Sequence, residues 1–200
     1  MTEKKKFFNS KKQLVKFLKR NLSKIDDKFD AIECQGNSYD HSSCEYLAEL
    51  INERGADTFY MANFSNMFVT RDKRSLPRSL ELLVNSISFK PVQKLYLHDN
   101  ALGPIGVEKI TDFLRSAHSL KVLSVSNCGL GPEATTMIAE SLLANEQTRL
   151  TELMISRSRV EEKGAIPLAE YFRTYDTLER LEIFQNAIKN ESATLLTQSL

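Results

Sequence analysis

The sequence has 200 residues, of which 42% are hydrophobic and 26% charged, and its formal net charge is +1. This composition is typical of a globular protein with a substantial core. No apolar run approaches the roughly 18 residues that a membrane-spanning helix needs. The three cysteines lack the paired spacing of a zinc site or a disulfide framework. We therefore expect an intracellular protein that uses its cysteines as small buried side chains.

Charge is distributed unevenly along the chain. Residues 1–28 carry 10 Lys or Arg against 3 Asp or Glu, a balance of +7, whereas the remainder has a balance of −6. A short apolar stripe within residues 14–18 predicts that 1–28 forms a basic N-terminal capping helix. In an alternative interpretation this segment binds acidic surfaces or serves as a nuclear address. The acidic remainder favours a basic partner over nucleic acid.

From residue 29 onward, apolar residues recur in a fixed pattern. The pattern begins with a leucine-type residue, two residues of any type and a second leucine-type residue. One residue of any type, an apolar residue, two further residues of any type and an Asn or Cys then follow. The stretch Leu120–Gly131 is one copy, and each copy precedes apolar residues at helical spacing. The spacings between successive copies are 27, 36, 28, 30 and 28 residues. We place the Asn/Cys positions at Asn37, Phe64, Asn100, Cys128, Ser158 and Asn186.

The second copy is degenerate. We align Ala56, Phe59 and Met61 with its apolar places, which puts Phe64 in the Asn place. A long insertion over residues 66–76 then lies between strand and helix. Repeat arrays commonly carry their binding loops at such positions.

This pattern is that of leucine-rich repeats with long units. We predict an α/β leucine-rich repeat solenoid of the ribonuclease-inhibitor-like type, with about six repeats over residues 29–200. Parallel strands should line the concave face of a horseshoe, and helices its convex face. The sequence ends inside the helix of the last repeat, so we expect a truncated domain.

Side chains alternate along a strand, which predicts two outward-facing rows. The first row, on the concave face, contains Tyr96, Ser124, Met154 and Glu182. The second row, at the strand ends, contains Asp99, Asn127, Arg157 and Gln185. Because Cys128 fills the buried place of its repeat, Asn127 is left facing outward.

Four segments resemble the GTPase-activating proteins for the small GTPase Ran. Residues 63–71 look like that family's degenerate second repeat and its arginine-containing loop, although Thr70 stands where the family has Gly. Residues 98–104, 127–132 and 157–161 are similar to further family segments. The resemblance covers about residues 28–200, roughly the first half of a family catalytic domain.

The resemblance implies a function exerted on a partner. Arg71 matches the family's functional arginine and Asn127 its functional asparagine, so these are the expected catalytic residues. Ran would supply GTP, magnesium and the glutamine that orients water. The chain would then need no cofactor, would not itself be an enzyme and would use no arginine finger. Expected partner contacts are Asn66, Asp99, Asn100, Arg157, Gln185 and Tyr96.

The resemblance also implies a monomer that acts in nucleocytoplasmic transport, in the cytoplasm or at the nuclear envelope, without binding nucleic acid or membranes. Two other functions remain open. A repeat scaffold would bind a protein through the concave row around Tyr96 and Met154 without GTPase-activating activity. A hydrolase would pair His98 with Ser126, although no nucleophile elbow accompanies them. In purely structural roles, Arg71 would tie down its loop and Asn127 would form a turn.

Overall fold

The main feature of the protein is a six-stranded parallel sheet. A computed structural model describes residues 5–21, 27–72, 74–147 and 149–200. The strands follow one another in the order β2-β4-β5-β6-β7-β8, and neighbours pair in parallel. Their bounds are β2 (Ala31–Glu33), β4 (Met61–Asn63), β5 (Lys94–Tyr96), β6 (Val122–Ser124), β7 (Glu152–Met154) and β8 (Arg180–Glu182).

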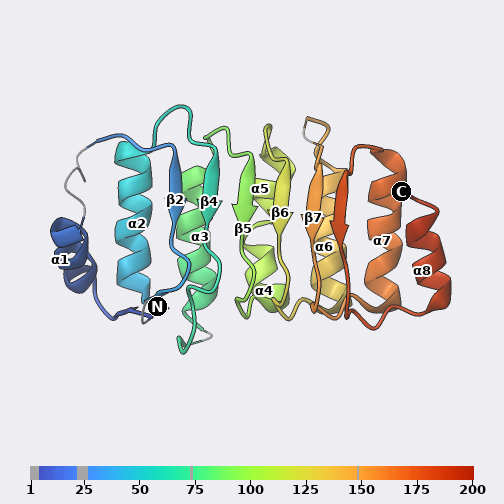
Figure 1. Cartoon of the computed structure of the whole chain (residues 1–200), viewed down its shortest axis with the longest axis horizontal. Helices are drawn as coiled ribbons and strands as arrows, with labels where there is room; N and C mark the ends of the chain where they lie inside the picture. Colours follow the sequence, from blue (N-terminus) through green and yellow to red (C-terminus); the bar gives the residue numbers. More distant parts are fainter. Residues whose placement is uncertain (1–4, 22–26, 73, 148) are drawn as a thin grey trace.

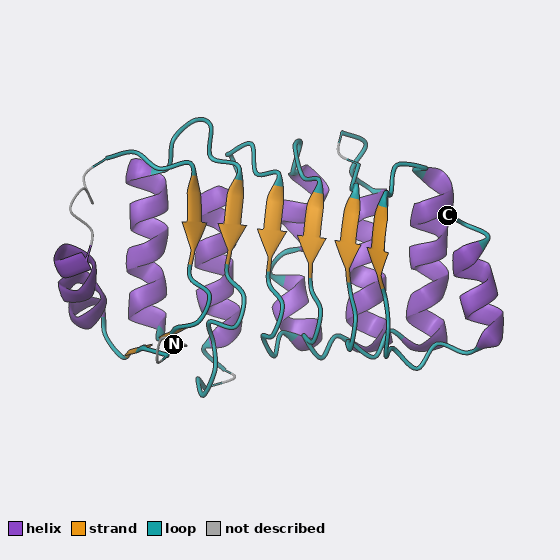
Figure 2. Ribbon diagram, in the orientation of Figure 1, coloured by secondary structure: helices purple, strands orange, loops and turns teal. Residues whose placement is uncertain are grey.

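Helices cover one face of this sheet and leave the other open (Figures 1 and 2). They are α2 (His41–Arg54), α3 (Leu76–Ile87), α4 (Gly103–Glu108), α5 (Thr111–Ser116), α6 (Gly131–Leu143), α7 (Glu161–Thr174) and α8 (Asn190–Thr197). The predicted α/β leucine-rich repeat fold is confirmed. None of the described helices has the length and apolar composition that spanning a membrane requires.

The N-terminal segment contributes one helix and one short strand. α1 (Lys11–Asn21) packs against α2 and buries Leu14, which is 1% exposed. α1 lies within the predicted capping segment, of which residues 1–4 and 22–26 fall outside the described residues. Before it, β1 (Phe7–Phe8) pairs in parallel with β3 (Ser38–Tyr39). This pair lies at the edge toward which the strands of the main sheet point (Figure 2).

The predicted register of the second repeat is wrong by three residues. Ala62 pairs with Leu95 of the next strand, so Ala62 occupies the central apolar place. Phe64 then corresponds to Leu97, and both side chains are fully buried. The Asn place therefore belongs to Met67, which has an apolar side chain and is also fully buried. The insertion does lie between strand and helix, as predicted.

Side chains in the Asn/Cys place hold the preceding repeat. The Asn100 amide nitrogen donates to the carbonyls of Phe64 and Leu97, and its oxygen accepts from the backbone N–H groups of Met67 and Phe68. Asn186 makes the equivalent four contacts to its neighbouring strands and turn. Cys128 and Ser158 each donate one hydrogen bond to the preceding strand. These bonds satisfy backbone groups that would otherwise be buried without partners.

One predicted helix is divided into two. The apolar positions from Val107 to Leu114 predict a continuous helix, whereas the structure separates α4 from α5. At the break, the backbone N–H groups of Lys109 and Ile110 bond three residues back rather than four. The Thr111 hydroxyl donates to the Glu108 carbonyl over 2.9 Å, which satisfies one group released by the break. Ile110 still reaches the core and is fully buried.

Candidate functional site

One residue at the end of each strand adopts a left-handed backbone conformation. It stands directly before the Asn/Cys place, where the chain turns sharply out of the strand. The residues are Gly36, Asn66, Asp99, Asn127, Arg157 and Gln185, with φ between 50° and 86°. Asn and Asp tolerate this conformation better than most residues. We use the name rim row for the five of these residues that have side chains, which are Asn66, Asp99, Asn127, Arg157 and Gln185.

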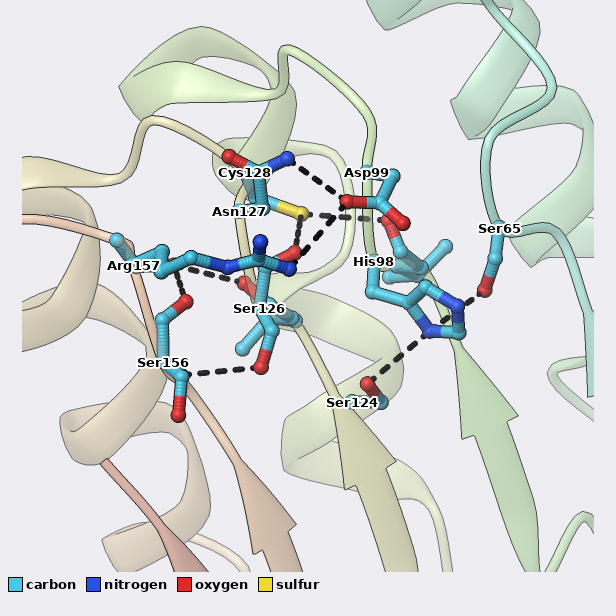
Figure 3. Close-up of polar contacts among 12 residues, drawn as sticks. Ser65, His98, Asp99, Ser124, Ser126, Asn127, Cys128, Ser156 and Arg157 are labelled. Atoms are coloured by element: carbon cyan, nitrogen blue, oxygen red, sulfur yellow. Dashed lines mark hydrogen bonds and ion pairs between the residues drawn. The ribbon is translucent and has the colours of Figure 1, made fainter. Parts of the chain in front are cut away.

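Asp99 is the centre of the polar contacts in the rim row. The Asn127 amide nitrogen donates to Asp99 Oδ1 over 2.7 Å, and Arg157 Nη2 lies 4.0 Å from the same oxygen (Figure 3). Asn127 and Arg157 are exposed, whereas Asp99 is half-buried. Among the described residues, nothing donates to Asn127 Oδ1. The structure therefore fixes the Asn127 amide through one N–H and leaves its carbonyl oxygen available to a partner.

A cation that no sequence motif marks, Lys5, also contacts the rim row. Lys5 Nζ donates to the backbone carbonyl and the side-chain oxygen of Asn66, each over 3.0 Å. Partial burial lowers the pKa of the Lys5 ammonium, an effect that the nearby Asp99 carboxylate opposes. Nothing in the sequence distinguishes Lys5 from the lysines beside it.

Arg71 is engaged by its own chain. Its Nε donates to the Ser38 hydroxyl, and its Nη2 donates to the carbonyls of Ser38 and Phe8, over 2.8 to 3.0 Å. Its Nη1 donates to Asn9 Oδ1 over 2.6 Å. These contacts match the structural role considered above, in which the arginine ties down its loop. Ser38 comes after β2 in the chain, whereas Asn127 comes after β6, and β2 and β6 are three strand spacings apart in the sheet, roughly 14 Å.

Thr70 precedes Arg71 and has a φ of 62°. A β-branched residue is strained in this conformation, whereas glycine adopts it freely. Glycine, which stands at this position in the family that the chain resembles, would thus fit the observed backbone. The Thr70 hydroxyl donates to the Val69 carbonyl over 2.7 Å.

Asn100 belongs to the core. It is 2% exposed, and both ends of its amide are used within the repeat stack. The prediction that Asn100 contacts a partner directly is therefore wrong, because the same residue holds the turn of the preceding repeat. Gln185 and Asn66 both lie in the rim row, at opposite ends.

The open face of the sheet carries the first predicted row. Strand pairing aligns Tyr96 with Ser124, Met154 and Glu182. Tyr96 and Met154 line a shallow depression of about 340 Å³, together with Arg180 and Phe184. Phe184 is 57% exposed. This surface offers apolar and charged groups to a protein partner.

His98 does not contact Ser126, the serine that the hydrolase interpretation pairs with it. Its Nδ1 lies 2.9 Å from the Ser65 hydroxyl and 3.2 Å from the Ser124 hydroxyl (Figure 3). Ser126 instead accepts from the backbone N–H of Ser156. The predicted pair of His98 and Ser126 is thus not formed.

The buried thiols are held in their neutral form. Burial raises the pKa of the Cys34 and Cys128 thiols to about 12, and it raises the pKa of Cys44 as well. Neutral thiols are poor nucleophiles and poor metal ligands. Among the described residues, no group of three His, Cys, Asp or Glu side chains is placed to hold a metal ion.

Comparisons with known proteins agree with this architecture. A leucine-rich repeat family model matches residues 116–139. The C-terminal domain of tropomodulin from Caenorhabditis elegans has a similar structure, with a TM-score of 0.62 and 18% identity over 78% of this chain and 90% of that one. At this identity the likeness concerns the fold alone. The fold and the repeats define a leucine-rich repeat protein.

Sequence relatives narrow the class further. The chain is 35% identical over 153 residues to the Ran GTPase-activating protein of Drosophila melanogaster, covering 70% of this chain and 26% of that protein. It is 28% identical over 170 residues to Ran GTPase-activating protein 1 of Xenopus laevis, covering 79% of this chain and 29% of that protein. The chain is thus a leucine-rich repeat protein that is similar to Ran GTPase-activating proteins. It spans less than a third of the length of these two relatives.

Proposed function

We propose that this protein is a GTPase-activating protein for Ran. The proposal is supported by the similarity to proteins named for that activity, which extends over most of this chain. It follows that the chain acts on a partner enzyme, which binds GTP and magnesium itself.

The observation that carries this proposal is the arrangement of Asn127. Its side chain is exposed at the strand end, and its orientation is fixed by the hydrogen bond to Asp99. An amide held in this way presents an oxygen acceptor to the partner. GTP hydrolysis depends chiefly on positioning and charge stabilisation. In our proposal, Asn127 accepts a hydrogen bond from the amide of the GTPase's catalytic glutamine, which in turn orients water.

The contacts of Arg71 support a mechanism without an arginine finger. A finger must extend its guanidinium into the partner's active site, where it stabilises charge on the transferring phosphoryl group. The Arg71 guanidinium instead makes four hydrogen bonds within its own chain. Extending it would break them, so we assign Arg71 no direct role in the chemistry.

Single-turnover hydrolysis tests the proposal. Ran loaded with labelled GTP is mixed with excess chain, and phosphate release is timed. We expect strong acceleration by the unaltered chain and its loss in Asn127→Ala. Asn85→Ala, which removes an exposed asparagine on α3, is the matched control and should retain full activity. No acceleration by the unaltered chain would contradict the proposal.

The depression around Tyr96 and Met154 supports a second candidate, a repeat scaffold without GTPase-activating activity. Phe184 is exposed at its margin, and exposed aromatic residues are common in protein interfaces. This candidate predicts that Phe184→Ser abolishes binding of a protein partner, whereas Asn127→Ala has no effect. The hydrolysis assay separates it from the first proposal.

A further inference from the structure

We propose that residues Lys5–Asn9, here called the strap, form part of the GTPase-binding edge and that Arg71 acts by holding them there. This inference rests on the function proposed above. It assigns Arg71 a positioning role and names Lys5 as a residue that contacts the partner.

Lys5 brings a positive charge to the end of the rim row. Two hydrogen bonds to Asn66 fix its ammonium group beside a residue in the same left-handed position as Asn127. An ammonium group has three N–H donors, so one remains for a partner. Its natural acceptor is a carboxylate on the surface of the GTPase.

The strap is attached to the repeat stack through backbone pairing. The Ser38 N–H donates to the Lys6 carbonyl over 2.8 Å, and the Asp40 N–H donates to the Phe8 carbonyl over 2.9 Å. The Phe8 side chain is 4% exposed and stacks on Tyr39 with ring centroids 5.2 Å apart. Only two residues of the strap lie in β1, so the strand pairing that attaches the strap is short.

Arg71 strengthens this attachment from the insertion loop. Its guanidinium bonds to the Phe8 carbonyl and to Asn9 Oδ1 on the strap, and to Ser38 on the strand beneath. One planar side chain therefore joins the strap, β3 and the insertion loop. A lysine carries its charge at a single point and cannot bridge these acceptors in the same fork. The position of Lys5 thus depends on an arginine at position 71.

Binding and turnover measurements test the two roles together. We expect Lys5→Ala and Arg71→Lys each to weaken the affinity for GTP-bound Ran about tenfold, since a charge-assisted hydrogen bond is lost. The single-turnover rate at saturating chain should stay unchanged in both variants. The double variant should bind no more weakly than either single variant, because Arg71 acts through the strap. Lys12→Ala, an exposed lysine on α1, is the control.

Hydrogen exchange tests the strap without any partner. Arg71→Lys should accelerate exchange at the Ser38 and Asp40 amides, which bond to the strap, while the amides of β6 and β7 remain protected. Unchanged exchange would overturn the positioning role of Arg71, and unchanged affinity in Lys5→Ala would overturn the contact role of Lys5. If the unaltered chain does not bind Ran, the proposed function and the contact role both fail. Hydrogen exchange would still decide whether Arg71 holds the strap.

Discussion

The amide of Asn127 donates to the carboxylate of Asp99 over 2.7 Å, between the ends of two neighbouring strands. Both residues have positive φ and stand directly before the buried place of their repeats. The repeat geometry thus sets two polar side chains next to each other and exposes the one that the proposed function requires. Arg157, which follows the strand next to that of Asn127, also approaches the Asp99 carboxylate.

Removing the carboxylate should disorder the Asn127 amide. We expect Asp99→Ala to reduce the single-turnover rate of GTP hydrolysis by Ran about tenfold, because the acceptor that fixes Asn127 is lost. Asp99→Asn keeps an acceptor oxygen, so its rate should stay close to that of the unaltered chain. A full rate in Asp99→Ala would show that the hydrogen bond does not matter for activation.

Replacement of a buried Asn in the repeat ladder should lower stability. Asn100→Ala leaves two backbone N–H groups and two carbonyls without their partner in the core. We expect a loss of about 3 kcal/mol in the free energy of unfolding, measured by urea denaturation. The exposed Asn85→Ala should change it by less than about 0.5 kcal/mol. Equal stabilities of the two variants would contradict this account of the ladder.

Thr70 should be a strained residue. Replacement by glycine, which accepts a φ of 62° without steric cost, is expected to raise the free energy of unfolding by about 1 kcal/mol. Thr70→Ala retains a β-carbon and loses the hydroxyl, so it should bring no such gain. The order of thermal midpoints in the two variants is the measurement. A glycine variant less stable than the alanine variant would show that this position is unstrained.

The buried thiols should make stability fall at alkaline pH. The pKa of Cys34 and Cys128 is about 12 in the folded protein and near 9.0 when unperturbed. The unfolded state therefore loses these protons first, and stability present below pH 9 declines as the pH rises toward 12. At pH 10 each thiol should contribute a loss of about 1 kcal/mol. Urea titrations at pH 7.5 and 10 measure this loss, and Cys128→Ser should reduce it.

A thiol reagent tests independently whether the three cysteine thiols are buried in the folded protein. At pH 8, all three cysteines should react only as fast as the protein unfolds, because they are buried and protonated. Rapid stoichiometric labelling of the native protein would contradict this.

The regular repeats could be predicted from the sequence because their spacing is set by the geometry of the stack. Asn100, Cys128, Ser158 and Asn186 all occupy the predicted buried place. The repeat pattern alone predicts the wrong register for the second repeat, because the residue in its buried Asn/Cys place, Met67, has no polar group. Its left-handed neighbour Asn66, in line with Asp99 and Asn127, is the signal that identifies the correct register.

The surroundings of Arg71 and Lys5 could not be predicted in the same way. Their contacts join segments far apart in sequence, and no local pattern brings residues 5–9 onto the end of the sheet. The break between α4 and α5 could not be predicted either, because Val107, Ile110 and Leu114 keep helical spacing across it. The exposure of Asn127, by contrast, followed directly from assigning Cys128 to the core.

The most direct test of the proposed mechanism is a mutant cycle between Asn127 and the catalytic glutamine of Ran. Single-turnover rates at saturating chain are measured for unaltered Ran and for Ran with this glutamine replaced by leucine, each with the unaltered chain and with Asn127→Ala. We predict that Asn127→Ala slows unaltered Ran about a hundredfold and has no further effect when the glutamine is absent. Equal slowing of both forms of Ran, or of neither, would contradict the proposal.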